Sequence, residues 1–320
     1  MSRLAEQNEV HLFSRDEAKH WTIKNRISKN FRVSFHVGDI RDSSRILQVT
    51  RHVNPNIIIL AAALKQVDTC EKEPYESIQT NILGIKNVVD AVLSQEYLLK
   101  NLETVLMVST DKACAPTNVY GMCKAVSERI ITSASLSSNR VKFLGVRYGN
   151  VLESRGSIIP LFRYQCENSD RITITHREMT RFIMTLTESI NLIEAAIYGA
   201  KTGEIWLPKL NSMKILDLAE IFATKYGKII EEIGIRPGEK LHEDLVSEPE
   251  SIRVRIEGDY MKMSPSYFEA DSNNKPFIFT SKDTLLDKIK LEEYLVGLKI
   301  FTKPLDQFLG LSIEEIRGNR

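Results

Sequence analysis

The most informative stretch of this 320-residue chain is Thr104–Lys124, which reads TVLMVSTDKACAPTNVYGMCK. Its first part, Thr104–Ser109, is an apolar, β-branched run typical of a buried strand. From Gly121 to Ala134 the apolar side chains recur at helical spacing. A strand that passes through a short polar turn into a helix predicts one unit of a parallel sheet wrapped by helices.

The same alternation extends outward from this segment. Further strands are predicted at Val10–Phe13, Val33–Val37, Ile57–Ala63 and Phe143–Val146, with a crossover helix at Asn81–Gln95. Ile57–Ala63 is apolar throughout, so we expect it in the middle of the sheet. Beyond residue 150 the pattern loosens into shorter elements, including Glu204–Leu207 and a helix at Ile215–Lys225.

These patterns predict an α/β fold with a Rossmann-like, doubly wound parallel sheet. We expect an NAD(P)-binding domain over residues 1–150 and a smaller lobe, mainly for substrate binding, over residues 151–320. Some elements of the second part are expected to return to the first domain.

Composition excludes several classes of function. Lysine and arginine total 43 against 42 acidic residues, without long blocks of one sign, so we expect neither a nucleic-acid nor a membrane surface. The longest apolar run, Ile57–Leu64, is too short to cross a bilayer, and we expect a soluble, cytoplasmic protein. The four cysteines lack a CxxC pair, and His176 and His242 lack companions at ligand spacing, so no metal is expected.

Tyr120 and Lys124 are four residues apart, which places both side chains on one face of the predicted helix. A lysine ammonium near a phenol favours the phenolate, so we expect Lys124 to lower the pKa of Tyr120. Tyr-x-x-x-Lys is common in ordinary helices, but here it follows a strand that ends in Ser109-Thr110, at the edge where open parallel sheets bind ligands. Thr110 and Ser109 could bond the hydroxyl that Tyr120 deprotonates.

This combination resembles the short-chain dehydrogenase/reductase family. The run Ser109-Thr110-Asp111-Lys112-Ala113 narrows the resemblance to its extended, polysaccharide-biosynthesis branch, and within it to the UDP-N-acetylglucosamine 4,6-dehydratases. Many retaining members carry long membrane-bearing N-terminal regions, which this sequence lacks, so we expect the inverting type, with a soluble retaining enzyme as the alternative. The similarity covers about residues 10–250 and includes the following segments: Ala61–Val67, Thr80–Gly84, Arg147–Val151, Met179–Phe182 and Gly234–Glu243.

The resemblance implies a role for each catalytic residue. Tyr120 would drive oxidation at carbon 4, assisted by Thr110, and Lys124 would hold the nicotinamide ribose. Asp111 would protonate the departing carbon 6 hydroxyl and Lys112 would take the carbon 5 proton, although these two roles could be exchanged. A UDP-sugar 4-epimerase, which needs mainly the tyrosine, remains the enzymatic alternative.

The resemblance also implies substrate contacts and a homo-oligomer, either a dimer or a hexamer. Arg236 is the first choice for the diphosphate, because arginine matches phosphate oxygens. The loop Gly156–Phe162 resembles the part that carries the nucleotide. The full expected substrate set is Lys65, Arg147, Asn150, Phe162, Arg181, Pro208, Lys209, Arg236 and Glu239.

The sequence departs from the family at its beginning. Dinucleotide-binding sheets open with a strand, a glycine-rich turn and a helix, whereas this chain has no glycine before Gly38. Glu9–Phe13 therefore corresponds to the second strand of such folds, and Met1–Gln7 to the tail of a missing helix. Either the sequence starts at an internal methionine of an intact enzyme, which the retained catalytic residues favour, or the protein is a noncatalytic UDP-sugar-binding or partner subunit.

Other positions bear on the cofactor. Ser14-Arg15 after the first strand indicates NADP, because an arginine there accommodates a 2′-phosphate, whereas Asp16 could serve NAD instead. By resemblance, the remaining cofactor contacts besides Tyr120 and Lys124 are Asp39, Ile40, Ala61, Ala62 and Lys65.

Overall fold

The computed structural model describes residues 5–154, 156–268 and 275–302, so Met1–Leu4 of the expected helix tail lie outside the described part. Its main sheet has the strand order β13-β14-β9-β5-β4-β3. Strands β3, β4, β5 and β9 are parallel, β14 is antiparallel to β9, and β13 is antiparallel to β14. The bounds are β3 Ile57–Leu60, β4 Thr104–Thr110, β5 Lys142–Tyr148, β9 Ile205–Pro208, β13 Val254–Glu257 and β14 Tyr260–Met263.

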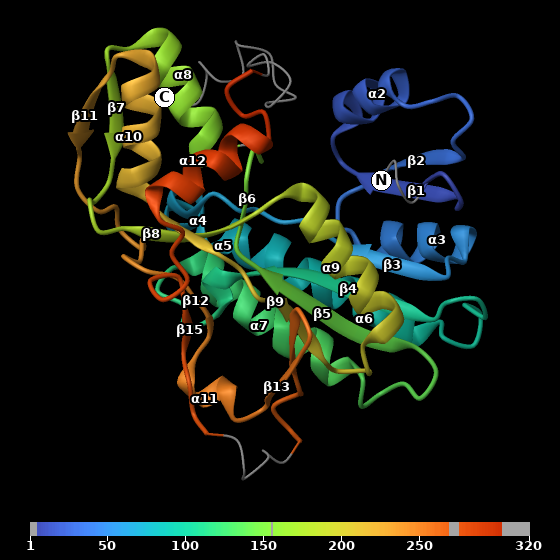
Figure 1. Ribbon diagram of the computed structural model, residues 1–320. Coiled ribbons are helices and arrows are strands. Elements are labelled where there is room, and N and C mark those ends of the chain that lie inside the picture. The colour runs from blue at the N-terminus through green and yellow to red at the C-terminus, as the bar shows by residue number, and fades with distance from the viewer. Residues whose placement is uncertain (1–4, 155, 269–274, 303–320) are drawn as a thin grey trace.

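Helices cover both faces of this sheet (Figure 1). Val105 and Met107 of β4 pack with α3 (Ser43–Val53), α6 (Gly84–Ser94) and α7 (Val119–Ala134). Leu106, which points to the opposite face, packs with α9 (Leu186–Gly199). This arrangement confirms the expected doubly wound α/β fold.

The first two strands form a sheet of their own. β1 (Val10–Ser14) pairs in parallel with β2 (Val33–Val37), and neither is hydrogen-bonded to β3 within the described residues. The ring of Phe35 contacts His20 of α2 (Glu17–Arg26), and that of the next residue, His36, contacts His52 of α3. Helices α2 and α3 therefore cover opposite faces of this small sheet (Figure 1).

The expectation that Ile57–Ala63 lies in the middle of the sheet is wrong. The strand ends at Leu60, and β3 is an edge strand of the main sheet, because β4 is its only described neighbour. Ile57 is accordingly 37% exposed despite its apolar side chain. An all-apolar run indicates burial between helical layers but does not say how many strands flank it.

The second lobe has its own hydrophobic cluster. It is built from α8 (Ile158–Asn168), α10 (Ile215–Tyr226), α12 (Lys288–Gly297) and the parallel pair β7 (Arg171–Ile174) and β11 (Ile229–Glu232). Two small sheets join it to the main sheet, namely β6 (Asn150–Val151) with β8 (Thr180–Met184) and β10 (Ser212–Lys214), and β12 (Asp244–Val246) with β15 (Phe279–Thr280). Short helices complete the described chain: α4 Val67–Lys72, α5 Pro74–Ser77, the π-helix η1 Ile78–Leu83, the 3-10 helix η2 Asp111–Ala113 and α11 Glu248–Ser251.

Within the described ranges, no helix is both long and apolar enough to cross a bilayer.

Candidate active site

The predicted catalytic residues lie on one continuous segment, Thr110–Lys124, which we call the catalytic turn. It runs from the end of β4 through η2 into the first turns of α7. β4 ends at Thr110, and Asp111 and Lys112 form η2 directly after it. Asn118 caps α7 by accepting a hydrogen bond from the backbone N–H of Gly121 at 2.8 Å. This cap starts the helix one residue before Tyr120, so the strand edge and the tyrosine helix are fixed together.

Gly121 lets the helix approach the turn closely. A Cβ atom at this position would collide with the backbone carbonyl oxygen of Lys112. The first turn of α7 therefore lies directly against η2, and a larger residue would push Tyr120 away from Asp111 and Lys112.

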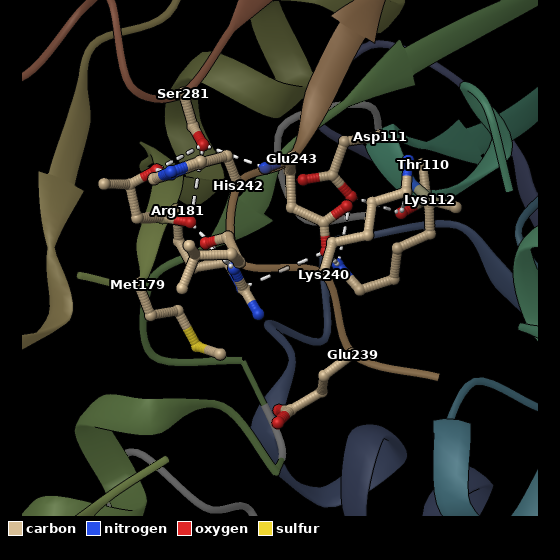
Figure 2. A network of polar contacts seen from close by, with 12 residues as sticks. Thr110, Asp111, Lys112, Met179, Arg181, Glu239, Lys240, His242, Glu243 and Ser281 are labelled. Carbon is tan, nitrogen blue, oxygen red and sulfur yellow. Dashed lines mark hydrogen bonds and ion pairs between the residues drawn. The ribbon is translucent and has the colours of Figure 1, made fainter. Parts of the chain in front are cut away.

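Asp111 and Lys112 form a partly buried ion pair at the strand end (Figure 2). Asp111 Oδ1 accepts hydrogen bonds from Lys112 Nζ at 3.1 Å and from Thr110 Oγ1 at 2.9 Å. The side chain of Asp111 is 1% exposed, and its Oδ2 atom has no partner among the described residues. Ser109 Oγ is likewise buried and without a described partner.

A second carboxylate, that of Glu243 directly before β12, also faces Lys112 (Figure 2). Its Oε1 atom lies 3.3 Å from Lys112 Nζ. Burial tends to lower the pKa of Lys112, but the negative charges of Asp111 and Glu243 outweigh it and raise that pKa above its ordinary value. Lys112 therefore carries its proton in this arrangement.

The phenol of Tyr120 lies in a buried environment. Burial raises the pKa of Tyr120 above its ordinary value, and Lys112 is the cation that counteracts this effect. Lys124 instead donates to the backbone carbonyl of Val108 at 2.6 Å, and burial lowers the pKa of Lys124 to about 8. The expectation that Lys124 lowers the pKa of Tyr120 is thus corrected: burial dominates, and the compensating charge comes from Lys112.

Arg147 does not face a ligand site. Its guanidinium lies in the core, where Glu128 accepts hydrogen bonds from Nε at 3.0 Å and Nη2 at 2.6 Å. Glu250 and the carbonyl of Leu245 take its remaining donors. Because all five N–H groups are occupied internally, the structure corrects the expectation that Arg147 binds substrate.

Phe162 is also a core residue. Its side chain in α8 is fully buried and meets Phe222 of α10 edge-on, with ring centroids 5.8 Å apart. The segment Gly156–Phe162 alternates between the surface and this cluster, and a motif match alone does not indicate which face Phe162 occupies. The expected contact between Phe162 and the base is therefore corrected.

Other substrate candidates do gather around the catalytic turn. Arg181, on β8, places Nε 4.0 Å from Glu243 Oε1 and donates from Nη1 to the carbonyl of Thr180 at 2.8 Å. β9 is parallel to β5 and so ends at the same sheet edge as β4; its last residue is the buried Pro208, and the exposed Lys209 follows it. Asn150, in β6, has a buried Oδ1 atom without a described partner.

The loop of residues 233–243 brings the remaining candidates toward the turn. The backbone N–H of Arg236 donates to Glu239 Oε2 at 3.2 Å, and the Arg236 side chain is exposed. Lys240 donates to the carbonyl of Cys114 at 2.8 Å, and Asn118 donates to the carbonyl of Gly238 at the same distance. These bonds hold the loop against the catalytic turn.

The expected adenosine contacts lie on the separate small sheet. Ser14 pairs with Val37 at the carboxyl end of β1, and Arg15 Nη1 lies 3.5 Å from Asp39 Oδ2. Arg41 binds Asp39 more closely, at 2.8 Å, and lowers the pKa of that carboxyl. The carboxylate of Asp16 caps α2 through the Lys19 N–H at 2.8 Å.

Four more cofactor candidates follow β2 and β3. Ile40 packs where a Cβ on Gly84 would sit, so its side chain is turned into the core. Ala61, Ala62 and Lys65 are exposed and follow β3. The expected cofactor residues therefore fall into two groups, one after β1 and β2 and one after β3 and β4.

Sequence reasoning missed Glu243 and the polar cluster behind it. Thr180 Oγ1 lies 2.8 Å from His242 Nδ1 and 2.7 Å from Ser281 Oγ (Figure 2). Glu243 stood at the end of a quoted motif, but nothing in its spacing ties it to Lys112. Among the described residues, no group of three or more histidine, cysteine or carboxylate side chains could hold a metal ion.

Comparison with known proteins places this geometry in a family. The family profile described as polysaccharide biosynthesis protein matches residues 2–265. The chain belongs to this family. The match confirms the resemblance to the polysaccharide-biosynthesis branch of the extended short-chain dehydrogenases.

Individual members of the family show the same relationship. The chain is 36% identical over 270 residues to a Campylobacter jejuni protein named UDP-N-acetylglucosamine 4,6-dehydratase (inverting), covering 83% of this chain and 78% of that protein. It is 38% identical over 259 residues to a Rickettsia canadensis protein named UDP-glucose 4-epimerase, covering 80% and 74%. The X-ray structure of Pen from Bacillus thuringiensis superposes with a TM-score of 0.85 at 32% identity, covering 93% of each chain.

Proposed function

We propose that this protein catalyses the NADP-dependent 4,6-dehydration of UDP-N-acetylglucosamine to a 4-keto-6-deoxy UDP-sugar. Carbon 5 is inverted, and the product enters surface-polysaccharide biosynthesis in the cytoplasm. The observation that carries the proposal is the ion pair between buried Asp111 and partly buried Lys112, 3.1 Å across, at the strand end beside Tyr120. The similarity to the Campylobacter jejuni dehydratase supports the same reading.

The reaction explains why the site has more proton-transfer groups than a tyrosine alone. The carbon 4 hydroxyl must lose a proton, the carbon 5 proton must be removed, and the carbon 6 hydroxyl must be protonated as it leaves. Tyr120 takes the first proton, with Thr110 beside it. Asp111 and Lys112 share the acid and base roles of the elimination, because an acid and a base within bonding distance can serve successive steps.

A nicotinamide cofactor supplies the hydride acceptor for the oxidation and the hydride donor for the return at carbon 6. The residues present suit its two ends. Arg15 is 63% exposed and suits a 2′-phosphate, while the carboxylate of Asp16 is already used as a helix cap, which favours NADP over NAD. At the other end, Lys124 is placed to hold the nicotinamide ribose.

Arg236 and Arg181 bind the diphosphate of the substrate, with Lys209, Asn150 and Glu239 at the same sheet edge. Arg236 is exposed on the loop of residues 233–243. Arg181, by contrast, already donates hydrogen bonds from Nη1 to the backbone carbonyls of Thr180 and Leu241. We further propose that the protein acts as a homo-oligomer.

Incubation with UDP-N-acetylglucosamine and NADP tests the function. We expect a product that has lost one water and carries a carbon 4 ketone, detected by mass spectrometry and NMR. Reaction in deuterated water should place deuterium at carbon 5, and the product sugar should have the inverted configuration there. Unchanged substrate from a folded protein that binds both ligands would refute the proposal.

A 4-epimerase is the second candidate, favoured by the similarity to the Rickettsia canadensis protein of that name. The same incubation distinguishes the two, because epimerisation gives UDP-N-acetylgalactosamine without loss of mass.

A noncatalytic UDP-sugar-binding subunit is the third candidate, favoured by the separation of β1 from β3 within the described sheet. Titration with NADP and with UDP decides this case. Binding of UDP without detectable binding of NADP or NAD would support the noncatalytic role.

A further inference from the structure

Glu243 is held rigidly in place. Its backbone N–H donates to Ser281 Oγ at 2.9 Å, and its carbonyl oxygen accepts from the N–H of Ser281 at 2.8 Å. The residue stands directly before β12, whose partner β15 ends at Thr280, so two neighbouring strands fix its backbone. The 3% exposed side chain thus has a defined position.

The carboxylate of Glu243 and that of Asp111 enclose one ammonium. Lys112 Nζ lies 3.3 Å from Glu243 Oε1 and 3.1 Å from Asp111 Oδ1. The other charged or titratable groups that act on Lys112 or on this carboxylate are Arg181 of β8, 4.0 Å from Glu243, and the phenol of Tyr120 in α7. Asp111 and Lys112 follow β4, whereas Glu243 precedes β12, so the contact joins two segments that are far apart in the sequence.

A second buried carboxylate beside Lys112 leaves polar atoms of the cluster unsatisfied. Asp111 already neutralises Lys112, and although Arg181 Nε lies 4.0 Å from Glu243 Oε1, a buried charge costs free energy unless all its oxygens are bonded. Here Asp111 Oδ2 and Glu243 Oε2 are both buried and without a partner among the described residues. Costly arrangements of this kind are typical of functional sites, where the position of a charge matters more than the stability it gives.

We propose that Glu243 is a positioning residue for Lys112: its carboxylate, at the start of β12, holds the ammonium beside Asp111 and keeps it charged. The inference rests on the proposed function in that Lys112 acts on the sugar. It adds a third member to the group that controls the elimination, which no motif had assigned.

The sign of the resulting pH effect does not depend on whether Lys112 is the acid or the base. Removing the negative charge of Glu243 weakens the stabilisation of the ammonium, so Lys112 loses its proton at lower pH. If the neutral amine is the base, the rising limb of kcat against pH moves to lower pH. If the ammonium is the acid, the falling limb moves in the same direction.

The kinetic test compares Glu243→Gln with Glu248→Gln, a matched change at an exposed glutamate of α11. We expect Glu243→Gln to lower the pH-independent maximum of kcat at least about tenfold with little change in KM, because Lys112 is no longer held in place, and to move the Lys112 limb by about one pH unit or more toward acid. Glu248→Gln should leave both unchanged. Glu243→Asp, which keeps the charge but withdraws it by one methylene, should give a smaller displacement in the same direction.

A second measurement does not require turnover. Lysine labelled with ¹³C, with the Lys112 signal assigned from Lys112→Arg, reports the titration of that ammonium by NMR. Titration of Lys112 at lower pH in Glu243→Gln, and less so in Glu243→Asp, supports the inference. Unchanged titration in both variants overturns it.

The two measurements separate the two proposals. If the wild-type protein makes no 4-keto-6-deoxy sugar while the NMR titration still responds to Glu243, the proposed function fails and the pairing stands. If the wild-type protein makes the 4-keto-6-deoxy sugar, but neither the kcat limb nor the Lys112 titration moves in the Glu243 variants, the positioning role of Glu243 is refuted and the proposed function stands.

Discussion

Arg147 and Glu128 join β5 to α7 through a doubly hydrogen-bonded ion pair, with Nη2 and Oε2 2.6 Å apart and Nε and Oε1 3.0 Å apart. Glu250 of α11 completes the cluster on the same guanidinium, at 2.8 Å. Helix α7 also carries Tyr120 and Lys124. The cluster therefore fixes the position of α7, and with it Tyr120 and Lys124, on the sheet.

Replacing Arg147 should destabilise the protein without touching the ligand site. Arg147→Met leaves two buried carboxylates without a counter-charge, and we expect the free energy of unfolding to fall by roughly 3–5 kcal/mol in urea titrations. The control is Arg171→Met, which breaks an exposed pair with Glu231 and should cost less than about 1 kcal/mol. Equal, small losses in both variants would contradict the structural role of Arg147.

The same cluster predicts how stability depends on pH. Burial tends to raise the pKa of Glu250, but Arg147 outweighs it and holds that pKa at about 2, below the ordinary value of 4.5. Because the folded-state pKa is depressed, the stabilisation is complete above pH 4.5 and is lost as pH falls toward about 2. Glu250→Gln should flatten this part of the stability profile, whereas Glu248→Gln should not, and an unaltered profile would argue against the pair.

The contact between Gly121 and Lys112 predicts a steric effect on catalysis. In Gly121→Ala the methyl group meets the carbonyl of Lys112, so α7 must shift, at a cost of about 1–3 kcal/mol. We expect loss of turnover together with a lower melting temperature. Gly297→Ala, at a helical glycine with open space around it, is the control and should change neither. Normal activity in Gly121→Ala would show that the close approach is dispensable.

Asp111 and Lys112 should matter for elimination more than for binding. Asp111→Asn and Lys112→Met each remove one proton-transfer group, and we expect kcat to fall by about 10²–10⁴ while UDP still binds. Lys86→Met, which breaks an exposed pair with Asp90 on α6, serves as the control. Mild and equal effects of all three changes on turnover would defeat the role assignment.

Arg15 should set the choice of cofactor. Loss of a charged hydrogen bond to a 2′-phosphate costs about 1.5–3 kcal/mol, so Arg15→Ser should weaken NADP binding by about tenfold to a hundredfold. Binding of NAD should change little, as measured by fluorescence titration. Arg26→Ser, an exposed arginine in α2, is the matched control. A parallel loss of affinity for both dinucleotides would show that Arg15 does not read the phosphate.

Features that depend on contacts between residues near in sequence could be predicted, whereas features that depend on contacts between distant residues could not. The turn between Asp111 and Tyr120 was predictable, because the hydrogen bonds that shape it join residues close together in the sequence. The edge position of β3 was not, since neighbouring strands are chosen by contacts distant in sequence. Arg147 and Phe162 stand in family-like motifs, but a motif does not say whether a side chain faces a ligand or the core.

The contribution of Glu243 was beyond reach for the same reason. Its carboxylate contacts Lys112, which is 131 positions earlier in the chain. Ser281, which fixes the backbone of Glu243, is a further 38 positions along the chain. The raised pKa of Tyr120 also depends on burial by several elements together, whereas the spacing of Tyr120 and Lys124 suggested only their mutual attraction.

The separation of the small sheet β1–β2 has an energetic consequence. Side chains of α3 and α6, rather than backbone hydrogen bonds within the described strands, connect this unit to the main sheet. Arg15 and Asp39 can therefore open as a unit at a lower free energy than β4 and β5, whose ladder spans seven residue pairs. A dinucleotide that bridges Arg15 and Lys124 must spend part of its binding energy on immobilising that unit, and amide hydrogen exchange in β1 and β2 should slow when it binds.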